Sequence, residues 1–430
     1  MSDDFRSDVA YVSKRQFEIM LKGVSGEKPK IPVRLDQLEG EAQKYMTEGA
    51  FSYVATGSGR GTTTQRNKDA FKKWVIIPRV LQNTNNLSTS VEIFGKKHDY
   101  PFLLGPLALH SERGKPGEAS VGRAAASENI GMVFSSYAST PMEVVAAGMG
   151  DCTRWFQNIW TQSERLNESL LRRAEACGCS ALVFTIDAPV VGWRTQDLTL
   201  GYSPFENSHG MGQYFSDPVF KEMLDVYMKS DAEMPSPKIN FTLIKYLIGM
   251  ARHYPGNTLS NLFSLRPQKA LMLVSHLTSE RSLTWEEIRS VRKLTKLPII
   301  VKGILNPEDA KLAVKYGMDA LVVSNHGGRQ LSSAIPSLDA LPDVIEAVNG
   351  KIPVFMDSGI RGGSDIFKAL ALGAHAVFIG RPYLFALAIA GEAGVKELIQ
   401  NLKAEFELLM ILSGCKSISE INRDRIKYLP

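Results

Sequence analysis

The stretch Ser324–Gln330 carries side chains that are suited to acid–base chemistry. It contains a histidine and an arginine three residues apart, His326 and Arg329, with two glycines between them. A histidine exchanges protons near neutral pH, and an arginine presents a planar pair of donors that matches a carboxylate. Glycines allow the backbone to approach a ligand closely. The motif therefore predicts a site that holds a small acid and removes a proton from it.

This motif follows an apolar run that has the composition of a buried strand, and similar runs recur from residue 101 onward. The runs are Phe102–Leu104, Met132–Phe134, Trp155–Phe156, Ala181–Phe184, Pro298–Val301, Ala320–Val323, Pro353–Met356 and Ala376–Ile379. Near-continuous apolar runs are typical of parallel strands buried on both faces. Since helical patterns separate the eight runs, we predict an α/β fold, a TIM (β/α)8 barrel. Such a barrel places its active site at the carboxyl ends of the strands.

The rest of the chain is predicted to surround this barrel as parts of one domain. Residues 1–100 are expected to form a helical segment that caps one barrel end, residues 101–394 the barrel, and residues 395–430 the C-terminal helices. Residues 195–282, after the fourth strand, show little periodicity and are expected to form a lid or an oligomer contact. Asn306, followed by a proline and two acidic residues, predicts the start of a helix.

Charged residues follow several of the predicted strands. Lys302 ends the fifth strand, where it could form a Schiff base or supply positive charge to a cofactor. Asp187 follows the fourth strand and could pair with His326 and orient its ring, or simply cap a helix. Arg194 lies shortly beyond and, with Arg329, would give two guanidinium groups for one carboxylate.

Two glycine-rich turns predict a phosphate site after the seventh and eighth strands. The first runs from Asp357 to Asp365 and contains Gly359 and Arg361, and the second is Gly380–Arg381. Glycine amides and helix N-termini bind phosphate, and TIM barrels often carry a phosphate site at this place. The alternative is that both segments are only tight turns. An arginine in each turn favours phosphate.

Composition excludes several other classes of protein. The chain has 430 residues with a net charge of +5, and its basic residues are scattered among acidic ones, which argues against nucleic acid as a partner. No apolar run reaches the roughly 18 residues of a transmembrane helix. The polar start Met1–Phe5 does not resemble a signal peptide. The histidines and cysteines show no metal-ligand spacing. We therefore expect a cytoplasmic protein with no metal and no membrane partner.

The Ser324–Gln330 motif resembles the signature of the FMN-dependent α-hydroxy acid oxidase family, which includes glycolate oxidase, lactate oxidase and lactate monooxygenase. The resemblance extends from about Ala50 to the C-terminus. Gly192–Arg194, Asp197–Thr199 and Ser216–Phe220 are most similar to the lactate monooxygenase branch. The resemblance implies FMN as cofactor, a small-molecule L-2-hydroxy acid and O2 as substrates, and a homotetramer or octamer.

The resemblance also implies roles for individual residues. His326 would be the catalytic base, and Asp187 and Lys302 would be the other catalytic residues. Arg329, Arg194 and Tyr53 would bind the substrate. The residues that would contact the flavin ring are Pro106, Leu107, Ala108, Ser135, Gln157, Thr185, Lys302 and Ser324. The ribityl chain and the phosphate would be held by Asp357, Gly359, Arg361, Gly380 and Arg381.

Two positions depart from the family pattern. Ile159 replaces a tyrosine that most members carry two residues after Gln157, and residues two apart on a strand face the same side. We therefore expect Ile159 to line the pocket and to favour an acid bulkier or more apolar than glycolate or lactate, with Tyr137 as an aromatic wall. Ala108 replaces the glycine of lactate monooxygenases. The sequence therefore leaves open whether peroxide and 2-oxo acid are released or oxidative decarboxylation occurs.

Two further functions stay open from the sequence alone. A lysine-dependent aldolase would use Lys302 for a Schiff base and the glycine-rich turns for a phosphorylated substrate. A catalytically inactive flavin-binding protein would explain the loss of a tyrosine at Ile159. The histidine and the paired arginines favour the oxidase over both.

Overall fold

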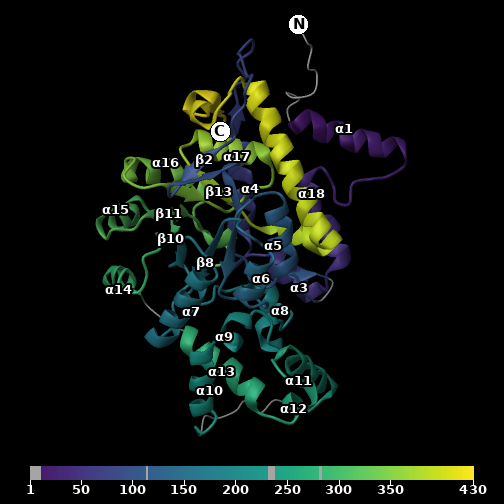
Figure 1. Ribbon diagram of the computed structural model, residues 1–430, viewed down its shortest axis with the longest axis vertical. Coiled ribbons are helices and arrows are strands. Elements are labelled where there is room, and N and C mark those ends of the chain that lie inside the picture. Colours follow the sequence, from purple (N-terminus) through teal and green to yellow (C-terminus); the bar gives the residue numbers. More distant parts are fainter. Residues whose placement is uncertain (1–10, 113–114, 231–237, 280–282) are drawn as a thin grey trace.

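Eight parallel strands close into a barrel at the centre of the molecule (Figure 1). The computed structural model describes residues 11–112, 115–230, 238–279 and 283–430. The barrel strands are β4 (Phe102–Leu104), β7 (Met132–Ser135), β8 (Arg154–Asn158), β9 (Leu182–Thr185), β10 (Ile299–Ile304), β11 (Ala320–Val323), β12 (Val354–Met356) and β13 (Ala376–Ile379). Each strand pairs with the next along the chain, and β13 pairs with β4. The predicted TIM barrel is confirmed.

Helices cover the outside of the barrel. They are α5 (Glu118–Ser127), α6 (Met142–Ala147), α7 (Glu164–Ala176), α14 (Trp285–Val291), α15 (Pro307–Lys315), α16 (Ser337–Val348), α17 (Gly363–Ala371) and α18 (Arg381–Ser413). The predicted start of α15 is present, because the Asn306 side chain accepts a hydrogen bond from the Glu308 amide at 2.8 Å. The backbone of α18 leaves the helical region at Ala390 and Gly391, which divides this helix in two.

The amino-terminal segment is mainly helical. It contains α1 (Tyr11–Val24), α2 (Leu38–Ala42), α3 (Glu48–Ala55) and α4 (Thr62–Lys72). Helix α1 packs against α18, where Arg15 donates hydrogen bonds to Asn401. After α4 in the chain, β1 (Trp74–Ile76) pairs antiparallel with β14 (Ile426–Tyr428), which lies near the C-terminus. Helices α3 and α4 lead toward the carboxyl ends of the barrel strands, where α4 contacts the turn after β11.

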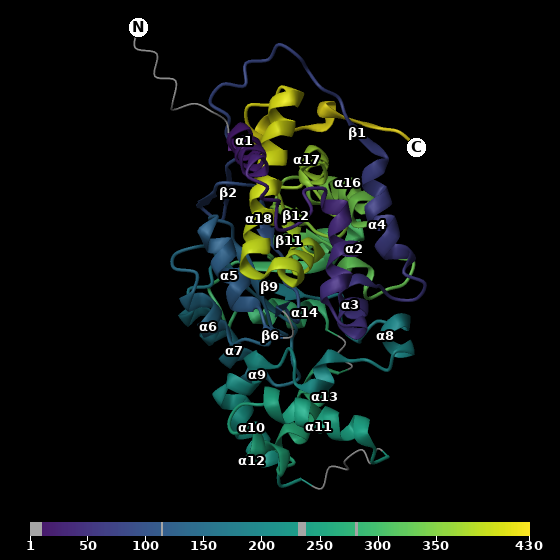
Figure 2. The same ribbon diagram turned by 90° about the vertical axis from the view of Figure 1, so that its right-hand side faces the viewer.

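A helical insertion follows β9. Its helices are α8 (Thr195–Thr199), α9 (Gly212–Ser216), α10 (Pro218–Tyr227), α11 (Phe241–His253), α12 (Thr258–Leu262) and α13 (Arg266–Thr278). Figures 1 and 2 show α9 to α13 gathered at one end of the molecule, away from α1 and the C-terminus. These helices were not predicted. Both faces of α11 carry apolar residues, among them the exposed Phe241 and Ile244, and this blurs the helical period.

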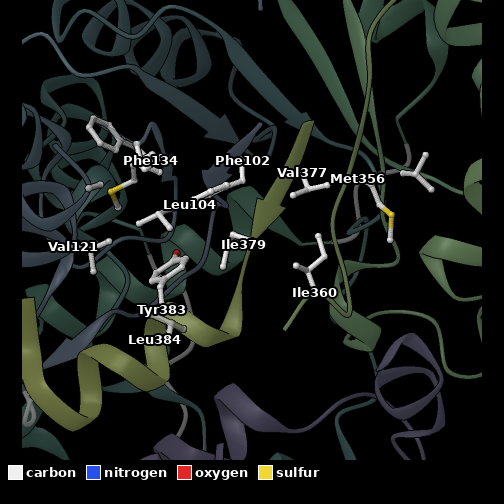
Figure 3. Packing of buried hydrophobic residues seen from close by; sticks show 14 of the residues in the cluster. Phe102, Leu104, Val121, Phe134, Met356, Ile360, Val377, Ile379, Tyr383 and Leu384 are labelled. Atoms are coloured by element: carbon white, nitrogen blue, oxygen red, sulfur yellow. The ribbon is translucent and has the colours of Figure 1, made fainter. Parts of the chain in front are cut away.

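The barrel strands are buried on both faces, which explains their continuous apolar runs. Their inward side chains form one core, with Leu103, Val133, Trp155, Val183, Ile300, Val322, Phe355 and Phe378. Their outward side chains join a larger core with the helices. Figure 3 shows part of it, where the outward residues of β4 and β13 lie beside Tyr383 and Leu384 of α18.

A short hairpin closes the amino-terminal end of the barrel. Its antiparallel strands are β2 (Val91–Ile93) and β3 (Lys96–His98). The ring of Phe94, in the turn between them, lies 5.9 Å from the ring of Trp155 and 6.4 Å from that of Phe355 inside the barrel. This end is therefore filled by apolar packing, and the polar residues gather at the opposite, carboxyl end.

Among the residues that the structure describes, no helix is long and apolar enough to cross a membrane. In the same residues, no group of three or more His, Cys, Asp or Glu side chains gathers in a way that could hold a metal ion. The four cysteines are not paired in disulfides.

Candidate active site

His326 and Asp187 meet at the carboxyl ends of β11 and β9. The Nδ1 atom of His326 donates to Oδ1 of Asp187 at 2.9 Å, which leaves Nε2 for a ligand in the cavity that His326 lines. The backbone is left-handed at three successive residues, with φ of 58° at His326, 65° at Gly327 and 77° at Gly328. A Cβ on Gly328 would lie 2.6 Å from the backbone nitrogen of Thr64. The glycine therefore permits both the turn and the close approach of α4.

The Asp187 carboxylate is arranged to hold a positive charge at the imidazole. Burial by itself would raise the pKa of Asp187, but His326 and Lys302 outweigh this effect and lower it. Its second oxygen, Oδ2, is buried and accepts no hydrogen bond from the residues described. The ionised carboxylate thus stabilises His326 once the ring has taken up a proton.

The ring of Tyr53 lies beside two guanidinium groups. The guanidinium carbon of Arg329 is 4.4 Å from the ring centroid and that of Arg194 is 5.5 Å from it. Nη2 of Arg329 and Nε of Arg194 are buried without a hydrogen-bond partner in the described part of the chain, although Nη2 of Arg329 lies 3.5 Å from the Asp197 carboxylate. Burial, and then the charge of Arg194, lower the pKa of Arg329 to about 10. Two adjacent cations with unused donors form a suitable site for a carboxylate.

Lys302, on β10, is a buried and charged side chain. Its Nζ lies 3.1 Å from Oδ2 of Asp357 and donates to Oγ of Ser324 at 2.9 Å. Burial opposes the charge, but the carboxylates of Asp357 and Asp187 outweigh it and raise the pKa of Lys302. Schiff-base formation needs a neutral amine, and this environment keeps the amine protonated. The geometry therefore argues against the lysine-dependent aldolase.

Three polar side chains form a hydrogen-bonded row across the ends of β7, β8 and β9. Oγ of Ser135 donates to Oε1 of Gln157 at 3.2 Å, and Nε2 of Gln157 donates to Oγ1 of Thr185 at 2.9 Å. These residues line a large cavity together with Pro106, Ala108, Lys302 and His326. The row is therefore held in one orientation before any ligand binds.

A second cavity of about 130 Å³ adjoins the first and has the character of an anion site. Its lining includes Leu107, Asp357, Gly359, Arg361, Gly380 and Arg381. The side-chain hydrogen bonds found for Arg361 and Arg381 go to backbone carbonyls. Burial lowers the pKa of both guanidinium groups, and for Arg381, with the added charge of Arg361, to about 9. Among the described residues, neither guanidinium forms an ion pair with a carboxylate, and two such cations fit the phosphate of a nucleotide cofactor.

The amino terminus of α17 differs from the expected phosphate cradle because protein carboxylates already occupy it. Oε2 of Glu405 accepts a hydrogen bond from the Gly363 amide at 2.7 Å, and Oδ2 of Asp365 accepts one from the Arg361 amide at 2.8 Å. A Cβ on Gly363 would lie 2.8 Å from the backbone nitrogen of Phe406. This glycine therefore serves the packing of α17 on α18, while Gly359–Arg361 and Gly380–Arg381 line the second cavity.

The remaining predicted residues also lie around the two cavities. Ile159 and Tyr137 line the large cavity, and the ring of Tyr137 lies 5.2 Å from the ring of Phe205 in the insertion. Asp187 and Ser324 line neither cavity. Each is hydrogen-bonded to a residue that lines the large cavity: Asp187 to His326, and Ser324 to Lys302.

Gln330 has a positioning role that the sequence did not reveal. Its Nε2 donates to the carbonyls of Asp187 and Val190 at 3.1 and 2.8 Å, and its Oε1 accepts from the Gly192 amide at 3.2 Å. This one side chain therefore ties the segment that carries Asp187 and Arg194 to the histidine motif. In the sequence, the hint of this role was that Gln330 directly follows Arg329.

Three further polar contacts, made by Asp197 and by an asparagine pair, were also not predicted. Asp197 lies 3.5 Å from Nη2 of Arg329 and accepts a hydrogen bond from Ser52 at 2.7 Å. The side chains of Asn67 and Asn325 form two reciprocal hydrogen bonds of 2.7 and 2.8 Å, which hold α4 against the motif. The partners lie 145 and 258 positions apart in sequence, so no local pattern could predict these pairs.

The fold and site together define a TIM-barrel enzyme with a pocket for a phosphorylated cofactor beside a site for a small acid. The model of the FMN-dependent dehydrogenase family matches residues 42–428, and the chain belongs to this family. The predicted family, its FMN cofactor and its oxidoreductase class are thereby confirmed.

The chain is similar to known proteins over nearly its full length. It is 37% identical over 401 residues to an L-lactate oxidase of Lysinibacillus sphaericus, covering 93% of this chain and 94% of that protein. It is 36% identical over 396 residues to 2-hydroxyacid oxidase 2 of Rattus norvegicus, covering 92% and 98%. A crystal structure of mandelate oxidase matches with a TM-score of 0.73 at 32% identity, covering 93% of this chain and 99% of that one.

Proposed function

We propose that this protein uses FMN to oxidise an L-2-hydroxy acid to the 2-oxo acid, with O2 as electron acceptor and H2O2 as second product. The observation that carries the proposal is the His326–Asp187 pair beside two guanidinium groups with unused donors. The names of the relatives, L-lactate oxidase, 2-hydroxyacid oxidase and mandelate oxidase, support this substrate class.

In this reaction, the chain's own side chains bind the acid and move a proton. Arg329 and Arg194 bind the carboxylate through their unused donors, with the Tyr53 ring packed beside them. This anchors C2 and its hydroxyl group in the cavity that His326 lines. Nε2 of His326 then accepts a proton from the substrate, and Asp187 stabilises the positive charge.

The cofactor would be held across both cavities. The row formed by Ser135, Gln157 and Thr185 would hold the flavin ring, with the charge of Lys302 beside it. Arg361 and Arg381 would hold the phosphate. When bound, FMN supplies the acceptor for the two electrons that leave the substrate.

The identity of the products is the direct test of this proposal. Ala108 lines both cavities at the position where lactate monooxygenases carry glycine, and we propose on this ground that the 2-oxo acid and H2O2 are released. Purified protein with an L-2-hydroxy acid in air should give 2-oxo acid and H2O2 in equal amounts. A shortened acid with carbon dioxide that still forms when added catalase removes free H2O2 would instead establish oxidative decarboxylation by the protein. Absence of product with every acid would contradict the proposed function.

We keep a homotetramer and a cytoplasmic location as further proposals. The resemblance to tetrameric family members supports the first of these proposals. Sedimentation equilibrium of the purified protein tests the assembly, and fractionation of the source cells tests the location.

A further inference from the structure

The large cavity offers far more space than a small acid needs. It encloses about 1520 Å³ and extends from His326 and Ile159 to helices α11 and α13 of the insertion. Ligand pockets usually enclose about 300–1,000 Å³. The flavin ring would fill the part beside Gln157 and Lys302, and the part beneath the insertion would stay unfilled with glycolate or lactate bound.

The insertion covers this cavity with an apolar surface, which we call the roof. Helix α11 contributes Leu243, Tyr246, Leu247 and Met250, and α13 contributes Leu271, Met272 and Val274. The α11 residues recur at the spacing of one helix face. Met250 and Ala251 are the buried residues of α11, so its apolar face is only partly covered by protein. An apolar ligand beneath the roof would complete that burial.

In the part of the chain that the structure describes, a buried side-chain oxygen of the roof has no hydrogen-bond partner. Oε1 of Gln268, on α13, is buried, lines the cavity and has no hydrogen-bond partner in the described part of the protein. A buried acceptor without a donor is costly, and a ligand donor at this point would remove the cost. Lys238 lines the same cavity, which disfavours a positively charged ligand group there.

Resting on the proposed oxidation of 2-hydroxy acids, we propose that the substrate carries a large, mainly apolar group on C2. This group fills the space beneath α11 and α13 and ends in a neutral hydrogen-bond donor that binds Oε1 of Gln268. Ile159 lines the same cavity as Arg194 and the roof residues, and it offers the group an apolar contact instead of a phenol. The insertion, and not the barrel alone, therefore sets the substrate.

Chain-length dependence of turnover tests this proposal in the FMN-loaded protein. With straight-chain L-2-hydroxy acids of increasing length, kcat/KM should rise about threefold to fourfold for each methylene that the roof buries. An acid that ends in an amide or hydroxyl group should react faster than the alkyl acid of equal length. The substitution Gln268→Leu should remove that advantage and leave the alkyl acid at least as fast.

Two substitutions that reduce the space beneath the roof test the inference structurally. Leu247→Trp on α11 and Met272→Trp on α13, made separately, should each lower the ratio of kcat/KM for the long acid to that for lactate by at least tenfold. Ile244→Trp is the matched control, because Ile244 lies on α11 but is 49% exposed and outside the cavity lining. It should leave the ratio unchanged. FMN content and thermal unfolding report whether each variant is folded.

Each outcome bears on one proposal or on both. If lactate is oxidised but kcat/KM does not rise with chain length, the roof does not bind the substrate and this inference is overturned while the proposed function stands. The same holds if folded roof variants leave the ratio unchanged. If no 2-hydroxy acid of any length is oxidised, both proposals fail.

Discussion

The imidazole of His326 is held by the carboxylate of Asp187 at 2.9 Å, although the two residues lie 139 positions apart in sequence. This contact fixes the ring and leaves its second nitrogen for the cavity. In the proposed reaction, His326 takes up the proton and Asp187 is the residue that positions it and compensates its charge.

Removal of the base should abolish most of the turnover without loss of the cofactor. A positioned general base contributes about 10²–10⁴-fold, so His326→Gln should lower kcat by a factor in this range. Asp187→Asn keeps the shape but loses the charge, and should lower kcat more than it raises KM. Stopped-flow kinetics and the flavin spectrum measure both effects. A KM change alone would assign these residues to substrate binding.

Arg329→Lys should weaken substrate binding although the charge is kept. A lysine cannot reproduce the planar pair of donors, and a hydrogen bond to a charged group contributes about 1.5–3 kcal/mol. We therefore expect kcat/KM to fall about tenfold to a hundredfold. Arg165→Lys is the matched control, because Arg165 forms an exposed ion pair with Glu222. An unchanged KM in Arg329→Lys would exclude this residue from the carboxylate site.

Arg361→Gln should weaken the binding of FMN but not that of riboflavin. If Arg361 holds the phosphate, its loss removes a charge-assisted contact that riboflavin never makes, and the Kd for FMN should rise about tenfold to a hundredfold. Fluorescence titration of the flavin-free protein measures both ligands. An equal loss of affinity for riboflavin would show that Arg361 supports the pocket structurally instead.

The buried carboxyl of Asp365 should make stability depend on pH. Burial raises its pKa from 3.8 to about 6. Because the folded state then binds the proton more tightly than the unfolded state, this group favours folding most at acidic pH, and the advantage is lost as the pH rises through about 4 to 6. Asp365→Asn should therefore gain stability relative to the unmodified protein over that range, by about 2–3 kcal/mol. Thermal unfolding of both proteins at several pH values measures this difference in stability. A pH-independent difference would contradict the raised pKa.

The barrel could be predicted from the sequence because its strands are buried on both faces. Runs such as Ala320–Val323 are continuous apolar segments for this reason, and the residues that follow them share one end of the barrel. Knowledge of that shared end was sufficient to predict that His326, Asp187 and Lys302 would come together.

Other features depend on contacts that no local pattern contains. The amide of Gly363 donates a hydrogen bond to Glu405, 42 positions away, so this amide is already occupied by a protein carboxylate. The insertion carries apolar side chains such as Phe241 on its outer face, which hides the helical period. Gln268 becomes notable only once its oxygen is seen to lie buried and unpaired in a cavity.

The central claim is that this protein transfers electrons from an L-2-hydroxy acid to its FMN. Its most direct test is the visible absorbance of the purified yellow protein during anaerobic addition of L-2-hydroxy acids of increasing size. We predict that the yellow absorbance is lost, fastest with a large apolar acid, and that it returns when air is admitted. A yellow protein that keeps its colour with every acid would contradict the claim.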